Sequence, residues 1–159
     1  MAGSGTDHLR PAADTLLRAE NLVVEFPAGK AGVVHAVTNV SIDVREGETL
    51  GLVGESGCGK STTGKALMQL PRPTDGAVMF KGDDLTKLSG ADLRRVRPAM
   101  QMIFQDPISS LNPRRKVEDI IAEGLDIWKL GDKEQRAQKV DDMLLTVGMD
   151  PAVARGRRP

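Results

Sequence analysis

The chain has 159 residues, 40% of them hydrophobic, and its 22 Lys and Arg side chains are balanced by 22 Asp and Glu. This size suits one modest domain or part of a larger one, and the charge balance argues against nucleic acid as a partner. No apolar run reaches the roughly 18 residues of a membrane span, and the single cysteine excludes an internal disulfide. These features predict a globular chain in a reducing compartment.

The first part of the chain, residues 1–19, is predicted to be a flexible leader, because it is rich in Gly, Ser, Pro and Asp. It lacks a basic stretch followed by an apolar one, so it does not have the pattern of a secretory signal. Residues 20–159 are predicted to form the folded region.

Five segments have the composition of strands: residues 20–26, 33–44, 49–53, 76–80 and 100–104. The second is long enough for one strand or for two antiparallel ones. Thr49–Val53 is a short continuous apolar run, which is typical of a strand buried on both faces, and Met100–Phe104 is apolar enough for a buried strand.

Four segments have helical composition. The first, Lys60–Leu70, stops before Pro71, and the second is expected to follow Ser89 as its N-cap, with Asp92 three residues later. The third and fourth, residues 117–128 and 134–147, carry apolar residues at helical spacing. Their predicted buried faces are Val117, Ile120, Ile121 and Leu125 in one and Val140, Leu144 and Val147 in the other. The order of elements predicts a mixed α/β fold.

The residues from Gly54 to Ser61, "GESGCGKS", match the pattern G-x-x-x-x-G-K-[ST] without a mismatch. Glycines let successive N–H groups turn inward around an anion, and the following helix adds its positive end. Lys60 can reach the β- and γ-phosphates, the Ser61 hydroxyl can ligate Mg²⁺, and Thr62 is placed to reach the α-phosphate. The pattern therefore predicts that the phosphates of a nucleotide bind here with Mg²⁺, and by itself it leaves transporters, kinases, GTPases and motor proteins open.

The preceding loop residues are also predicted to bind the nucleotide, in addition to Lys60, Ser61 and Thr62. They are Gly54, Glu55, Ser56, Gly57, Cys58 and Gly59. Cys58 lies at an unconstrained position of the pattern. A thiol near the start of a helix should nonetheless be more reactive than a free one. A glycine-rich turn without function is the alternative, but the apolar run before the loop and the helix after it favour phosphate binding.

Two further stretches of the sequence indicate which class of nucleotide-binding protein this chain resembles. "ETLGLV" before the loop and "MIFQDPISSLNPRRKV" some forty residues after it resemble the ATP-binding subunits of ABC transporters, in particular the oligopeptide and dipeptide importers. The resemblance runs from about Asn21 to the end of the chain. It implies a P-loop NTPase core with an antiparallel β subdomain and the start of a helical subdomain.

The resemblance also implies roles for single residues. Gln105 corresponds to the glutamine that contacts Mg²⁺ and the attacking water, and Phe26 corresponds to the aromatic residue that stacks on adenine. The alternatives are a polar residue that ends a strand for Gln105 and a core aromatic for Phe26. The loop from Gln105 to Arg114 is expected to face the membrane-spanning permease subunits.

The remaining partners are also implied by the resemblance alone. They are a second, homologous or identical ATP-binding subunit and, indirectly, an extracytoplasmic solute-binding protein. The expected location is the cytoplasmic face of the cell membrane, held there peripherally.

Other groups of the family pattern are not found in the sequence. "LSG" at 88–90 does not continue as the family's signature motif and is better explained by helix capping, and no apolar run ends in Asp-Glu. The chain is therefore expected to be an N-terminal portion that ends before the signature, binds ATP and lacks the groups for hydrolysis. A non-catalytic nucleotide-binding remnant and a soluble P-loop kinase are the alternatives. His8 and His35 have no companions that suggest a metal site.

Overall fold

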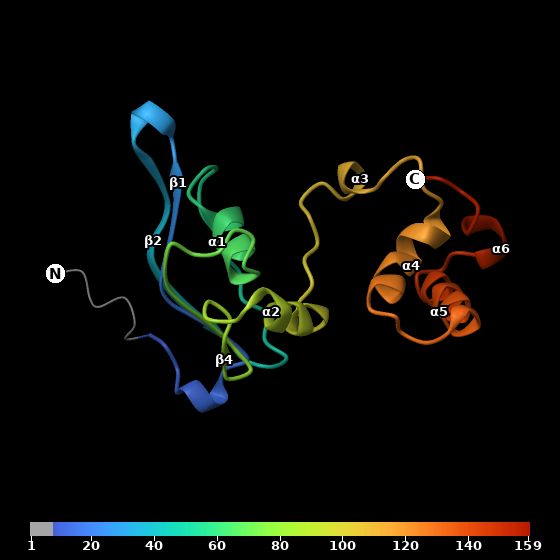
Figure 1. The fold of residues 1–159 in the computed structure, drawn as a ribbon, viewed down its shortest axis with the longest axis horizontal. Helices are drawn as coiled ribbons and strands as arrows, with labels where there is room; N and C mark the ends of the chain where they lie inside the picture. The colour runs from blue at the N-terminus through green and yellow to red at the C-terminus, as the bar shows by residue number, and fades with distance from the viewer. Residues whose placement is uncertain (1–7) are drawn as a thin grey trace. The chain divides into compact units, whose positions relative to one another are not determined.

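The computed structural model describes residues 8–159. The chain divides into two compact units, one up to Met102 and the other from Ile103 to Pro159 (Figure 1). The first unit contains all the strands, and the second is helical. This division follows the predicted order of a strand-rich part and a helical part.

A four-stranded antiparallel sheet forms the base of the first unit, in the order β2-β1-β3-β4. Its strands are β1 (Leu17–Pro27), β2 (Val33–Val44), β3 (Asp75–Phe80) and the short β4 (Asp83–Asp84). Residues 33–44 were expected to form one strand or two antiparallel ones, and they form the single strand β2. The hairpin of β1 and β2 pairs Leu17 with Val44 at one end and Pro27 with Val33 at the other.

The strand β1 begins three residues before the predicted start of the folded region. Arg18 and Ala19 are buried, and the 3-10 turn Ala12–Asp14 precedes the strand. Further upstream, the backbone N–H of Arg10 donates to Asp43 over 2.7 Å. Residues 17–19 are therefore part of the sheet, because they pair with β2 on one side and with β3 on the other. Residues 1–7 of that leader lie outside the described part.

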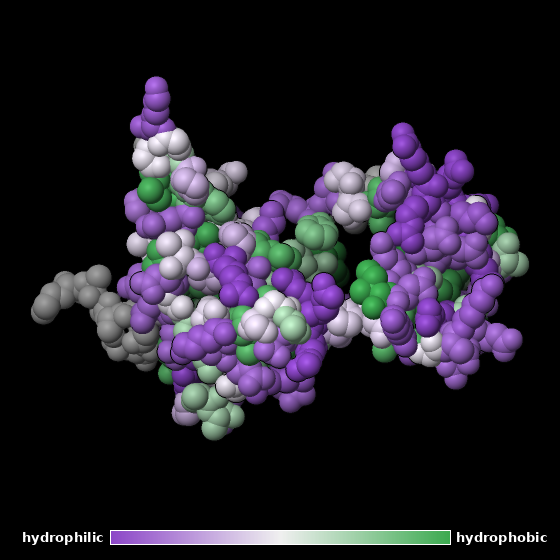
Figure 2. Space-filling view, viewed as in Figure 1, coloured by the Kyte–Doolittle hydropathy of each residue, from purple (hydrophilic) through white to green (hydrophobic). Residues whose placement is uncertain are grey.

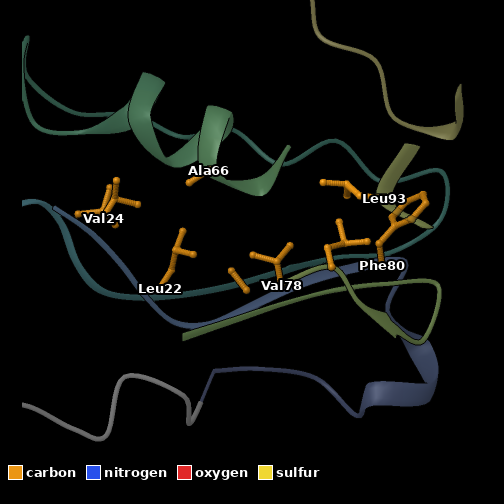
Figure 3. Close-up of a cluster of buried hydrophobic side chains, with 9 residues drawn as sticks. Leu22, Val24, Ala66, Val78, Phe80 and Leu93 are labelled. Carbon is orange, nitrogen blue, oxygen red and sulfur yellow. The ribbon is translucent and has the colours of Figure 1, made fainter. Parts of the chain in front are cut away.

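Helices α1 (Lys60–Leu67) and α2 (Gly90–Val96) cover one face of the sheet. Figure 3 shows Leu22 and Val78 of the sheet pointing toward Ala66 of α1, and Phe80 lying beside Leu93 of α2. Ser89 caps α2 as predicted, since its hydroxyl accepts from the Asp92 N–H over 3.2 Å. This core fixes α1, and with it the end of the glycine-rich loop.

Two predicted strands do not form. Thr49–Val53 and Met100–Phe104 have no strand conformation, and their side chains are largely exposed, with Val53 92% and Ile103 93% accessible. A strand buried on both faces needs neighbours that take up its backbone hydrogen bonds and cover its side chains. Among residues 8–159 no strand pairs with either run, so the apolar composition alone predicted the wrong local structure.

The second unit contains the short helices α3 (Pro107–Ser110) and α6 (Pro151–Ala154) and the longer α4 (Val117–Ile127) and α5 (Lys133–Thr146). Its core is formed by Leu125, Val140, Leu144 and Ala154. The prediction that Val147 belongs to this buried face was wrong. Because α5 ends at Thr146, Val147 leaves the helical register and is 69% exposed. No helix within residues 8–159 is long and apolar enough to span a membrane.

Candidate functional site

The glycine-rich loop leaves the extended residues 49–53 and ends at α1. Gly57 and Gly59 have left-handed backbones, with φ of 82° and 93°. Gly59 is the N-cap of α1, and its carbonyl accepts from the Thr63 N–H over 2.8 Å. A Cβ on Gly59 would lie 2.3 Å from the Ala36 carbonyl oxygen. Only glycine fits there, because both the backbone angle and the approach to β2 exclude a side chain.

The backbone N–H groups of this loop are available to a ligand. Among the described residues, none accepts a hydrogen bond from the N–H of Gly57, Gly59 or Lys60. They adjoin the first turn of α1, where the helix dipole adds positive potential. Unpaired N–H groups at a helix start form an anion-binding site. The loop therefore has the geometry to receive phosphate oxygens.

Lys60 is folded back over the loop. Its Nζ donates to the carbonyl oxygens of Gly54 over 2.7 Å and Glu55 over 2.5 Å, and lies 3.5 Å from the Cys58 Sγ. These acceptors are neutral, and no carboxylate of residues 8–159 forms an ion pair with the ammonium, so its positive charge next to the free N–H groups is uncompensated. A bound phosphate would supply the missing negative charge, and this arrangement fits the phosphate of a nucleotide.

Ser61 and Thr62 follow on the first turn of α1. Ser61 is exposed and lines a groove of about 630 Å³ together with Lys60 and Thr63. Its hydroxyl makes no hydrogen bond with any other described residue. A free hydroxyl oxygen next to a phosphate cradle is a fitting ligand for Mg²⁺, so the donor set agrees with the predicted metal role. Thr62 is half-buried on the same turn.

The sequence did not predict the groove itself. Apolar side chains from β2, the 49–52 segment and α1 form its wall: Ile42, Val44, Leu50, Leu52 and Leu67. The alternation of Ile42 and Val44 along β2 predicts that the two side chains share one face of the strand. It does not predict whether other parts of the chain cover that face. The groove leaves the start of α1 accessible.

The other predicted loop residues surround Lys60. Gly54, Glu55, Ser56 and Cys58 are exposed, and a Cβ on Gly54 would lie 2.7 Å from the Cys58 Sγ. The Cys58 N–H donates to the Glu55 carbonyl over 3.4 Å, which closes a turn. The structure thus brings all nine predicted residues from Gly54 to Thr62 into one loop and helix start.

Phe26 lies near the far end of the β1–β2 hairpin, paired with Val34 and 39% exposed. The loop touches this hairpin at Ala36, two residues along β2 from Val34. An accessible ring on the same hairpin agrees with a base-stacking position, which stays a prediction. Gln105 is exposed in a bend of the second unit, before α3, and its role likewise stays a prediction.

Both histidines contact other groups within the described part of the chain. No group of three or more His, Cys, Asp or Glu side chains in the described part could hold a metal ion. The His8 ring is hydrogen-bonded to the Ser41 carbonyl over 2.6 Å, and the His35 Nδ1 lies 2.7 Å from the Glu25 carboxylate.

A charged cluster that sequence reasoning missed supports β2. The Arg10 guanidinium donates to Asp43 over 2.6 Å and to Glu48 over 2.9 Å. Burial opposes ionisation of Asp43, but the hydrogen bonds from Arg10 outweigh it and lower the pKa of Asp43. The hydrogen bond from Arg10 also lowers the pKa of Glu48. Arg10 and Asp43 are 33 positions apart in the sequence, so no local sequence pattern predicts that they pair.

Comparison with known proteins agrees with this geometry. The protein "Oligopeptide transport ATP-binding protein OppF" of Bacillus subtilis (strain 168) is 50% identical over 139 residues, which are 86% of this chain and 45% of that protein. "Dipeptide transport ATP-binding protein DppF" of Lactococcus lactis subsp. cremoris (strain MG1363) is 46% identical over 138 residues, covering 85% of this chain and 44% of that protein. The chain thus spans less than half the length of these curated relatives.

Solved structures and a family model point the same way. The "Dimeric structure of a post-hydrolysis state of the ATP-binding cassette MJ0796 bound to ADP and Pi" matches with a TM-score of 0.75 at 23% identity, covering 90% of this chain and 61% of that one. This likeness confirms the predicted P-loop NTPase fold class, with its antiparallel β part and helical part. The family model described as "ABC transporter" matches residues 37–157. Because this family model matches, and because the glycine-rich loop and the fold agree with it, we conclude that the chain belongs to the ABC transporter family.

Proposed function

We propose that this chain binds ATP with Mg²⁺ through its glycine-rich loop, as the ATP-binding part of an importer for peptides or related solutes. The observation that carries the proposal is the Lys60 ammonium, held over the loop by the Gly54 and Glu55 carbonyls. Gly57, Gly59 and Lys60 would donate N–H groups to the phosphates, and Ser61 would ligate the metal. The peptide class follows from the names of the relatives.

The site residues would act by position and charge. When nucleotide enters, Lys60 exchanges two carbonyl acceptors for phosphate oxygens, which strengthens its hydrogen bonds because the acceptor is then charged. Bound Mg²⁺ would screen the phosphate charge, with the Ser61 hydroxyl as a protein ligand. Phe26 would cover the adenine, and Gln105 would orient water at the metal. Residues 1–159 contain no apolar run ending in Asp-Glu and no signature motif, which hydrolysis in this family requires, so we expect these residues to bind ATP without turnover.

The proposed partners complete this function. A second ATP-binding subunit would face the nucleotide, and the loop from Gln105 to Arg114 would contact permease subunits at the cytoplasmic face of the membrane. A solute-binding protein outside the membrane would deliver the cargo. A non-catalytic nucleotide-binding remnant is the second candidate, favoured by the exposed run 49–53 beside the loop.

Titration with ATP by calorimetry, with and without Mg²⁺, tests the proposal. Loss of a charged hydrogen bond is worth about 1.5–3 kcal/mol, so Lys60→Ala should weaken ATP binding roughly 10- to 100-fold. Lys65→Ala is the matched control, because Lys65 is exposed on the same helix and its side chain forms no hydrogen bond or ion pair with a described residue. Equal affinity of the two variants would contradict the proposal. Phosphate release by the wild type that Lys60→Ala abolishes would refute the expectation of no turnover.

A further inference from the structure

The start of β3 interrupts the ladder that this strand forms with β1. The pairs on either side of the interruption are Glu20 with Ala77 and Val23 with Asp75. Gly76 lies between them and has no partner in this register. Its backbone is left-handed, with φ of 87°. The peptide group between Asp75 and Gly76 is therefore outside the regular pairing of the two strands.

Only glycine fits at position 76. A Cβ there would lie 2.5 Å from the Asn21 carbonyl oxygen and 2.6 Å from the Glu20 carbonyl oxygen, and the left-handed backbone also disfavours a side chain. The aspartate at position 75 is thus followed by a glycine that the fold requires. No other Asp-Gly pair, and no Asn-Gly pair, occurs in the 159 residues.

The carboxylate of Asp75 is held against the next amide group. The Gly76 N–H donates to the Asp75 Oδ1 over 2.7 Å. Because Cγ is bonded to Oδ1, this hydrogen bond keeps the carboxyl carbon beside the amide nitrogen, and glycine has no side chain that would shield that nitrogen. Two reacting groups held together in this way react faster than groups that meet by chance.

We propose that Asp75 is a modification site, which converts to isoaspartate through a cyclic imide formed with the Gly76 nitrogen. In the first step the nitrogen bonds to Cγ, one C–O bond of the carboxyl group breaks, and one water leaves with the amide proton. In the second step one water opens the ring. Attack at the main-chain carbonyl leaves the chain linked through Cγ with a free α-carboxylate, whereas attack at Cγ restores aspartate. No oxidant or reductant is needed.

The site does not depend on distant parts of the chain, because the two reacting groups belong to adjacent residues. Asp75 is exposed, and hydrophilic side chains cover much of the first unit on the face in Figure 2, so water is available for the second step. The new α-carboxylate is the chemical group that carboxyl methyltransferases using S-adenosylmethionine accept. The inference is also independent of nucleotide binding.

The modification should destabilise the sheet. An isoaspartyl linkage adds one carbon to the main chain directly before Gly76, where the carbonyls of Glu20 and Asn21 leave no room. The following residues of β3 include Val78, which is fully buried in the core beneath α1. The modified chain should therefore unfold at a lower guanidinium concentration than the unmodified chain.

Prolonged incubation of the folded full chain at physiological pH and temperature tests the proposal. Enzymatic methylation measures total isoaspartate, and peptide mapping with electron-transfer fragmentation assigns its position. We expect isoaspartate to form at Asp75 roughly 10-fold faster than at any other aspartate. Asp83 is the internal control, because it is exposed on β4 and is followed by Asp84 rather than by glycine. Formation at Asp75 no faster than at Asp83 would overturn the proposal.

Asp75→Glu separates this site from the rest of the chain. Glutamate keeps the charge but would have to close a six-membered imide, which forms much more slowly, so the variant should lose the isoaspartate signal of the wild type. Circular dichroism establishes that the variant is folded. An undiminished methylation signal in the folded variant would mean that the reaction occurs elsewhere. If the variant does not fold, the position assigned by fragmentation of the wild type decides alone.

A comparison with the unfolded chain tests the role of the hydrogen bond. The contact between Gly76 and Asp75 predicts that the folded chain forms isoaspartate at least as fast as the same chain unfolded in guanidinium. Much slower formation in the folded chain would show that the strand protects Asp75, and would overturn the proposal.

Discussion

The Ala36 carbonyl oxygen of β2 lies 2.3 Å from the point that a Cβ on Gly59 would occupy. This contact ties the end of the glycine-rich loop to the central hairpin, so the loop and the sheet hold each other in place. A change at Gly59 should therefore affect both stability and ligand binding.

Gly59→Ala should lower the free energy of unfolding by more than the roughly 1–3 kcal/mol that a strained left-handed backbone costs, because backbone atoms also overlap. It should also abolish ATP binding. Urea unfolding and calorimetry measure the two effects. Gly64→Ala is the control: Gly64 is inside α1 with open space around its Cβ position, so alanine there should raise stability by up to about 1 kcal/mol. Similar losses for both variants would contradict the close approach.

Alkylation of Cys58 should block nucleotide binding. The thiol is exposed and lies 3.5 Å from the Lys60 Nζ, so an added group would occupy the space of the phosphates. N-ethylmaleimide should therefore abolish ATP binding, and ATP should slow the labelling, as mass spectrometry over time would show. Cys58→Ala should bind ATP and resist the reagent. Equal labelling rates with and without ATP would place the ligand elsewhere.

Val53→Thr distinguishes an exposed segment from a buried strand. Val53 is 92% exposed and Leu85 is fully buried, so Val53→Thr should change the free energy of unfolding by less than about 0.5 kcal/mol. Leu85→Ala should cost about 2–5 kcal/mol. Chemical denaturation measures both. A loss above 1 kcal/mol for Val53→Thr would mean that the segment is buried in solution.

The Arg10–Asp43 pair should make stability depend on pH. Since the folded pKa of Asp43 is lowered, the stabilisation is present above the unfolded pKa of about 3.9 and is lost as pH falls through the folded value. The difference in urea midpoint between the wild type and Asp43→Asn should therefore be full at pH 6 and shrink below about pH 4. Val53→Thr removes no titratable group and should show no such trend. A difference that stays constant to pH 2 would contradict the pairing.

Local patterns predicted the parts of this molecule that depend on neighbours in sequence. The loop from Gly54 to Ser61, the cap at Ser89 and the strand 33–44 are each set within a dozen residues, and the structure confirms them. The run 49–53 was predicted wrongly, because whether an apolar run is a strand depends on partners that its composition does not reveal. Arg10 and Asp43 could not be paired from sequence for the same reason.

The start of α4 shows how such distant contacts affect folding. Its first two N–H groups are capped by the carbonyls of Arg155 and Arg157, about forty residues further along the chain. During synthesis this helix start therefore cannot be completed until Arg155 and Arg157 have left the ribosome. Until then α4 has unsatisfied donors and frays from its first turn. Closing this long loop should be a late step in the folding of the unit, which a pulse-labelled hydrogen exchange experiment would detect as delayed protection of Val117 and Glu118.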